Sequence, residues 1–194
     1  MGRKPRQLSE TGLYHVIIRG NNKGRLFRDE ADFDKFLKIA SEYREKHPGS
    51  VHHYCLMANH VHLLIKSEDP IILSKYMHSV QRAYHHYYRK RYVYFGHLFQ
   101  GRYRSFPVET EGYLLDCGRY IERNPVRAGM VEDPKDWRYS SYGFYAYGQE
   151  DDLVTESVLY KALGEGAARQ KLYREYVEVT RPYEKLIDKE LVGV

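Results

Sequence analysis

The chain has 194 residues, of which 31 are Lys or Arg and 26 are Asp or Glu, so its formal net charge is +5. Apolar residues make up 42% and charged residues 29%, values that are typical of a globular protein and exclude wholesale disorder. No apolar run approaches the about 20 residues that span a bilayer, and none follows the basic N-terminus as in a secretory signal. The 2 cysteines lack metal-type spacing, so we expect a cytoplasmic protein with reduced thiols and no membrane partner.

Tyrosine is frequent, with 20 residues, and charge is unevenly spread. Residues 150–194 hold ten acids and seven bases, so this tail carries −3 and residues 1–149 carry +8. The segment 70–108 has no acid, but it has seven Lys or Arg and seven tyrosines. Cations attract phosphates, and aromatic faces stack unpaired bases at about 1–3 kcal/mol each. The segment is therefore a candidate surface for single-stranded nucleic acid. The alternative is a solvated basic helix whose tyrosines pack in the core.

The first part of the chain predicts a strand, a helix and two further strands. Residues 14–19 are rich in β-forming types and end at a Gly-Asn-Asn turn signal. Asp29 is placed to cap a helix whose apolar residues recur at helical spacing until Pro48. Residues 51–57 and 60–65 predict two strands, and the short connection between them predicts a hairpin.

The next part predicts two helices around an irregular stretch. Pro70 opens a helix that runs to about residue 88, and residues 96–107 are irregular or partly extended. A helix follows from 109 to about 123, bounded by Pro125 because a proline disfavours helix at the preceding residue.

The remaining chain predicts a loop at 137–148 and two short helices, at 155–163 and 166–179. The whole order predicts an α+β fold of ferredoxin-like type, with an antiparallel sheet, helices packed on one face and the other face free to bind a ligand. We expect a main domain at residues 1–148, including a basic N-terminal arm, and an acidic helical tail at 149–194.

His60 and His62 alternate with Val61 in the third predicted strand. Side chains two residues apart on a strand point to the same face, so two imidazoles emerge side by side. Imidazole suits divalent transition metals, and two on one rigid strand provide most of a facial metal site. When this spacing stands alone, two half-exposed histidines without a ligand are the simpler interpretation.

Tyr120 and Asn124 are four residues apart on a predicted helix and therefore share one of its faces. A phenol beside an amide oxygen offers a nucleophile and a metal ligand from one surface. Three other tyrosines have a ligand-type residue at the same spacing, but their settings are less suitable. Tyr43 lies on the apolar side of its helix, and Tyr145 and Tyr147 lie in the predicted loop.

Four sequence blocks resemble those of the HUH single-tyrosine transposases, in which U is a bulky apolar residue. In chain order they are Tyr14-His15-Val16 with Arg19-Gly20-Asn21, Leu56-Met57-Ala58-Asn59-His60-Val61-His62-Leu63-Leu64, Gly96-His97-Leu98-Phe99-Gln100-Gly101-Arg102-Tyr103 and Arg119-Tyr120-Ile121-Glu122-Arg123-Asn124-Pro125-Val126-Arg127-Ala128-Gly129. Together they resemble the branch associated with repetitive extragenic palindromes (REP), the REP-associated tyrosine transposases, over residues 10–145. Ala58 departs from the pattern, because the family more often has proline there; the change alters a turn and removes no ligand.

The resemblance implies an HUH nuclease core in which His60, His62 and Asn124 hold Mg²⁺ or Mn²⁺ and Tyr120 is the nucleophile. It implies cleavage of single-stranded DNA near hairpins through a 5′-phosphotyrosine, followed by strand rejoining. Single-stranded or hairpin DNA is then the partner, and both a homodimer and a monomer stay open.

Basic residues are further candidates for DNA contact. Those of the N-terminal arm and first strand could hold a hairpin, and those of segment 70–108 could guide a strand toward the histidines. The set is Arg3, Lys4, Arg6, Arg19, Lys23, Arg25, Arg82, Arg89, Lys90, Arg102 and Arg104. A solvated surface charge is the alternative for each.

Two other functions stay open at this point. A non-catalytic DNA or RNA binding module would bind single strands regardless of chelator or of Tyr120. A metal-dependent phosphohydrolase that uses activated water would leave no covalent protein–DNA species.

Overall fold

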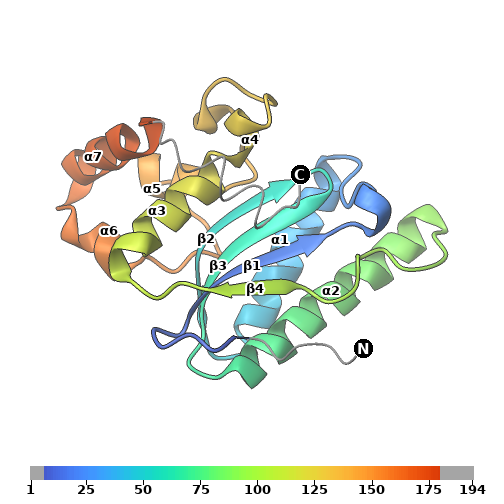
Figure 1. Ribbon diagram of the computed structural model, residues 1–194. Coiled ribbons are helices and arrows are strands. Elements are labelled where there is room, and N and C mark those ends of the chain that lie inside the picture. The colour runs from blue at the N-terminus through green and yellow to red at the C-terminus, as the bar shows by residue number, and fades with distance from the viewer. Residues whose placement is uncertain (1–6, 180–194) are drawn as a thin grey trace.

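The computed structural model describes residues 7–179. Its centre is a four-stranded antiparallel sheet in the order β2-β3-β1-β4 (Figure 1). The strands are β1 (Leu13–Arg19), β2 (Ser50–Met57), β3 (His60–Lys66) and β4 (Arg104–Pro107). One helix follows β1 and another follows β3, which gives the ferredoxin-like succession of elements. The predicted α+β fold with an antiparallel sheet is confirmed.

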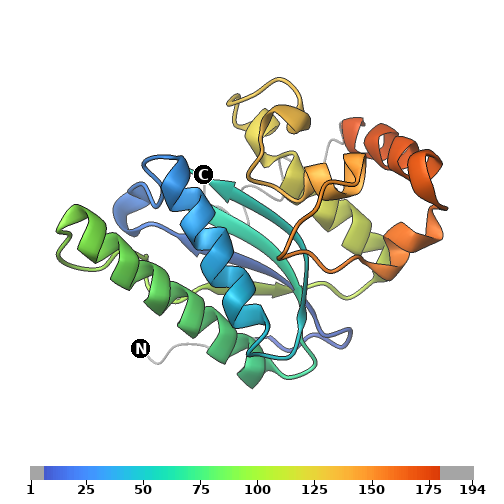
Figure 2. The ribbon, with the colours of Figure 1, turned by 180° about the vertical axis from the view of Figure 1, so that it is seen from behind.

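Two helices, α1 (Glu30–Arg44) and α2 (Pro70–Tyr92), run across one face of the sheet (Figure 2). Asp29 caps α1 as predicted, since its side chain accepts a hydrogen bond from the Asp32 amide. α2 begins at the predicted proline, where a missing N–H is tolerated, and runs four residues beyond the predicted end. The apolar residues of the strands that face these helices form the main core.

The tyrosines of segment 70–108 belong to this core rather than to a base-stacking surface. Tyr76, Tyr84, Tyr88 and Tyr103 are buried, and Tyr87, Tyr92 and Tyr94 pack partly buried against them. The hydroxyls of the tyrosines on α2 are also engaged: Tyr84 donates to the Leu26 carbonyl at 2.7 Å. Tyr87 and Tyr92 donate to the buried carboxylate of Asp32. The stacking hypothesis is wrong for the four buried rings, because they fill the space between the sheet and the helices.

The other face of the sheet is partly covered, which corrects the prediction that it is free. Helix α3 (Glu111–Glu122) packs there through Leu114, Cys117 and Ile121, and a short helix, α4 (Asn124–Arg127), follows it. An apolar helix stripe needs a partner, and the sheet is the nearest one. At Gly118 the approach is so close that a Cβ atom would lie 2.6 Å from the His53 ring.

The C-terminal part adds three helices beside α3 (Figure 1). They are α5 (Tyr142–Tyr147), α6 (Val158–Ala162) and α7 (Gly166–Glu178), and two one-turn 3₁₀ helices, η1 (Asn21–Lys23) and η2 (Pro134–Asp136), lie elsewhere. The two predicted tail helices are present, but α5 lies where a loop was predicted. Tyr142 and Tyr145 of α5 are buried against Tyr160 and Tyr173, a small core that local sequence signals do not reveal.

Within residues 7–179, no helix is both long enough and apolar enough to cross a membrane.

Candidate active site

His60 and His62 lie side by side on the face of the sheet that α3 covers, as their spacing predicts. Their ring centroids are 4.9 Å apart. In β1, Arg19 pairs with His60 and Ile17 pairs with His62. His62 is fully buried, whereas His60 is partly exposed at the end of the strand. A ligand from solvent would therefore reach the pair from the His60 side.

Helix α3 brings Tyr120 to these histidines. The ring of Tyr120 stands edge-on to the ring of His62, with centroids 5.9 Å apart and an interplanar angle of 83°. Tyr120 is buried, with 1% of its surface exposed. Because one chain supplies both imidazoles and the phenol, the candidate site is assembled within a single protomer.

Asn124 also lies next to Tyr120, although the helix predicted to carry both is interrupted. α3 ends at Glu122 and Asn124 is the first residue of α4. The Asn124 amide nitrogen donates to the carbonyls of Tyr120 at 2.9 Å and Ile121 at 3.2 Å. Carbonyls only accept hydrogen bonds, so the nitrogen is fixed there and the amide oxygen Oδ1 is the atom that could bind a metal.

His15 is a site residue that sequence reasoning missed. It is buried in β1, its Nε2 atom lies 2.9 Å from Nδ1 of His62, and its ring centroid lies 5.8 Å from that of Tyr120. It therefore contacts both the candidate ligand and the candidate nucleophile. The alternation of β1 could have placed it on this face, but its proximity to His62 depends on the pairing of β1 with β3.

Asn59 fixes the orientation of His60. Its amide nitrogen donates to the Lys23 carbonyl at 3.2 Å, so its amide oxygen is the atom that lies 2.6 Å from Nδ1 of His60. An amide oxygen only accepts, so Nδ1 carries the proton and Nε2 of His60 carries the lone pair. This is the arrangement by which a neighbouring group prepares a histidine for metal binding.

Burial keeps the three imidazoles of the site neutral at pH 7. It lowers the pKa of His15 to about 3, and burial together with the charge of Arg19 lowers the pKa of His60 to about 4. The pKa of His62 is well below its usual value, first because of burial and then because of its neighbours His60, His15 and Arg127. Neutral imidazoles offer the lone pairs that metals need.

The donor set fits a divalent metal. Nε2 of His62 is buried and has no hydrogen-bond partner among residues 7–179, and Nε2 of His60 carries a lone pair. In that part of the chain, no three His, Cys, Asp or Glu side chains are arranged so that they could hold a metal ion among themselves. A metal here would instead be held by two imidazoles and the Asn124 amide oxygen, a mixed nitrogen and oxygen set.

Three guanidinium groups make the site positive. Arg19 pairs with His60 across the strands, and Arg104 on β4 pairs with Ile17, which places it on the same face. Arg127 of α4, which sequence reasoning missed, lies 4.7 Å above the centroid of the Tyr120 ring. A cluster of cations around neutral ligands suits an incoming phosphate.

The other predicted DNA contacts divide by location. Lys23 and Arg25 are exposed in the loop that hydrogen-bonds to the β2–β3 turn, so they lie near His60. Arg102 is exposed in the loop before β4. Arg3, Lys4 and Arg6 lie outside the described residues.

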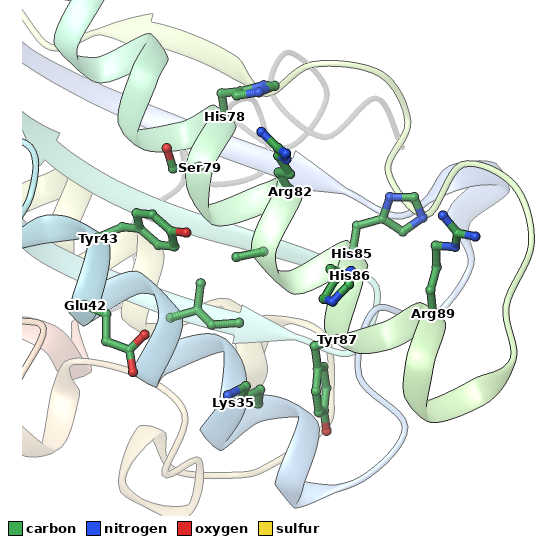
Figure 3. Close-up of a pocket in the computed structure, with 12 residues that line it drawn as sticks. Lys35, Glu42, Tyr43, His78, Ser79, Arg82, His85, His86, Tyr87 and Arg89 are labelled. Atoms are coloured by element: carbon green, nitrogen blue, oxygen red, sulfur yellow. The ribbon is translucent and has the colours of Figure 1, made fainter.

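The remaining predicted contacts, Arg82, Arg89 and Lys90, lie on α2. Two of them line a groove of about 820 Å³ between α1 and α2. Figure 3 shows Lys35 and Tyr43 on α1 and Arg82 and Arg89 on α2, the two helices that border this groove. Because α2 and α3 cover opposite faces of the sheet, these cations do not line the site of His60.

Comparison with known proteins identifies relatives of this chain. It is 23% identical over 150 residues to a protein of Haemophilus influenzae provisionally named a REP-associated tyrosine transposase, covering 71% of this chain and 83% of the relative. Its fold is similar to that of a REP-associated tyrosine transposase solved with a REP hairpin, with a TM-score of 0.63, 16% identity, and coverage of 87% of this chain and 96% of the other.

A second solved structure, a protein of Deinococcus radiodurans provisionally named a transposase, has a TM-score of 0.43 and 20% identity, and the match covers 63% of this chain and 97% of the other. A family model described as "Transposase IS200 like" matches residues 9–124, a span that includes both histidines, Tyr120 and Asn124. That span covers more than half of the sequence, so this chain belongs to the IS200-like transposase family.

Proposed function

We propose that this chain is a REP-associated tyrosine transposase that cuts single-stranded DNA beside a hairpin and rejoins strands through a covalent bond to Tyr120. The observation that supports this most is the phenol of Tyr120 standing edge-on to His62, with Asn124 bonded to its backbone. Family membership supports the reaction class, and this arrangement supports Tyr120 as the nucleophile.

The Tyr120 oxygen attacks the scissile phosphorus, a bond to phosphorus forms, and the bond to the 3′ oxygen breaks. The products are a 5′-phosphotyrosine and a strand with a free 3′-OH. A phenol has a pKa of about 10 in water, so the charge of its phenolate must be stabilised. Arg127 lies above the ring and supplies a positive charge. Attack by another 3′-OH reverses the step, restores the phenol and conserves the phosphodiester bond.

We assign His60, His62 and Asn124 as the ligands of a divalent metal, Mg²⁺ or Mn²⁺. Such an ion, when bound, polarises the scissile phosphate and offsets charge in its transition state. Asn59 and His15 hold the two imidazoles in orientation, and burial keeps both of them neutral.

We assign two groups of cations to DNA binding. Arg19, Lys23, Arg25 and Arg104 lie at or near the His60 end and contact the strand to be cut. The remaining predicted cations, Arg3, Lys4, Arg6, Arg82, Arg89, Lys90 and Arg102, contact the hairpin or its flanks.

Residues 1–148 form the catalytic domain and residues 149–194 form its acidic tail. The protein acts in the cytoplasm, and one protomer suffices for cleavage.

A covalent-adduct assay tests the proposal. The full chain is incubated with a hairpin-bearing single strand and Mn²⁺, and the products are separated on a denaturing gel. We expect a protein–DNA band that chelator and Tyr120→Phe abolish. Tyr147→Phe is the matched control, because Tyr147 is an exposed tyrosine on α5. An adduct that persists in Tyr120→Phe would overturn the assignment of the nucleophile.

The alternatives give different results in the same assay. A non-catalytic binding module retards the strand but yields no adduct with any metal. A phosphohydrolase cuts the strand without an adduct and tolerates Tyr120→Phe.

A further inference from the structure

The C-terminal end of α7 is hydrogen-bonded to two arginines that lie close to Tyr120 in the sequence. Nε of Arg119 donates to the Tyr176 carbonyl at 3.1 Å. Nη1 of Arg123 donates to the carbonyls of Val177 at 3.0 Å and Glu178 at 3.1 Å. The last carbonyls of a helix lack partners within it, and positive charge there is favourable. Two arginines that flank the nucleophile therefore cap the end of α7.

Glu122, two residues after the nucleophile, extends this connection. Its carboxylate is fully buried and accepts from the Tyr173 hydroxyl of α7 at 2.7 Å and from the Ser141 hydroxyl at 2.6 Å. Nδ1 of His53 on β2 lies 3.0 Å from it. A buried carboxylate is costly unless its oxygens are bonded, so these contacts favour one placement of the last turn of α3.

These contacts fix the rotation of α3 about its own axis. With 3.6 residues per turn, Arg119 and Arg123 project from a different side of the helix than Cys117 and Ile121, which face the sheet. α3 is thus held between the sheet and α7. Tyr120 projects from a helix that is fixed on both sides, so loosening one side shifts its ring relative to His62.

We propose that α7 is a positioning element for the nucleophile, acting through Glu122, Arg119 and Arg123. This role rests on the proposed function of Tyr120 and gives the tail segment 149–179 a part in the reaction, although it contributes no group to the phosphate. Displacements of about 1 Å in a reacting group can lower a rate about 100-fold, so a modest shift of Tyr120 is sufficient.

The test uses the full chain with 3-fluorotyrosine at position 120 and reads its ¹⁹F resonance without DNA or metal. Tyr173→Phe removes the hydroxyl that reaches Glu122. Tyr160→Phe is the matched control, because Tyr160 is buried in the same small core but donates to the Tyr145 carbonyl. We expect Tyr173→Phe to shift or broaden the resonance and Tyr160→Phe to leave it unchanged.

The same variants, with natural tyrosine at 120, are compared in single-turnover cleavage with saturating DNA, below their unfolding temperatures. We expect the rate to fall about 10-fold or more in Tyr173→Phe with DNA affinity unchanged, and to stay near wild type in Tyr160→Phe. Arg123→Met should act like Tyr173→Phe, and Arg123→Lys, which keeps a donor, should restore part of the rate.

The two proposals fail in distinguishable ways. If the wild type forms no adduct, the function of Tyr120 is wrong, yet the ¹⁹F comparison still reports whether α7 fixes that ring. If Tyr173→Phe and Tyr160→Phe give the same resonance and the same rate, α7 only stabilises the fold and the positioning role is overturned.

Discussion

Acid should destabilise this protein through its buried imidazoles, and His15 should account for a measurable part of the decrease in the free energy of unfolding. An unfolded histidine titrates near pH 6.5, whereas burial lowers the pKa of His15 to about 3. Between these values the unfolded chain binds a proton that the folded chain does not. The contribution that neutral, buried His15 makes to the free energy of unfolding is therefore complete above pH 6.5 and is lost as the pH falls toward 3.

The size of the effect follows from the pKa shift. At pH 4.5, two units below the unfolded value, His15 alone lowers the free energy of unfolding by about 3 kcal/mol, at about 1.36 kcal/mol per unit. The pKa of His60 is lowered to about 4, so His60 adds a similar amount, and the lowered pKa of His62 acts in the same direction. His15 and His60 together, at about 5 kcal/mol, already reach the lower end of the about 5–15 kcal/mol that stabilises a typical domain.

Urea unfolding of the metal-free protein at pH 7 and pH 4.5 measures this loss. His15→Gln removes one buried imidazole, while its amide can still bond to His62. The fall in unfolding free energy between the two pH values should be about 2–3 kcal/mol smaller in this variant than in wild type. His78→Gln removes an exposed imidazole of α2, and in this variant the unfolding free energy should fall between the two pH values by as much as in wild type. Equal losses in all three proteins would refute the reasoning.

Other substitutions test the site and its support. His15→Phe should weaken Mn²⁺ binding about 10- to 100-fold, because His62 loses its orienting partner. His15→Gln should retain most of the Mn²⁺ affinity. Titration with Mn²⁺ followed by electron paramagnetic resonance measures the affinity of both variants. Gly118→Ala should destabilise the protein by about 1–3 kcal/mol in urea unfolding, although alanine is the better helix former, because its methyl group would collide with the His53 ring. Arg127→Gln should slow single-turnover cleavage about 100-fold with little change in DNA affinity, and an unchanged rate would remove Arg127 from the reaction.

The parts of the fold that could be predicted depend on local patterns. The strand pair around residues 58–59 follows from two β-rich runs with a short connection, and α1 follows from Asp29 and the helical spacing after it. The side-by-side placement of His60 and His62 follows from the alternation of a strand.

The parts that could not be predicted depend on contacts between distant residues. His15 reaches His62 because β1 pairs with β3 in one register, and no feature near His15 reveals this. Helix α3 covers the second face of the sheet through contacts with strands that are distant from it in the sequence. Glu122 is satisfied by Tyr173, 51 residues away, so its role appears only in the folded chain.

The central claim is that Tyr120 becomes covalently attached to DNA. Trypsin can cut after Arg119 and Arg123, which leaves a four-residue peptide in which Tyr120 is the one tyrosine. After cleavage of a hairpin-bearing strand and nuclease digestion, mass spectrometry of the tryptic peptides should find a 5′-linked nucleotide on this peptide. Finding the nucleotide on another peptide, or on none while the strand is cut, would contradict the account.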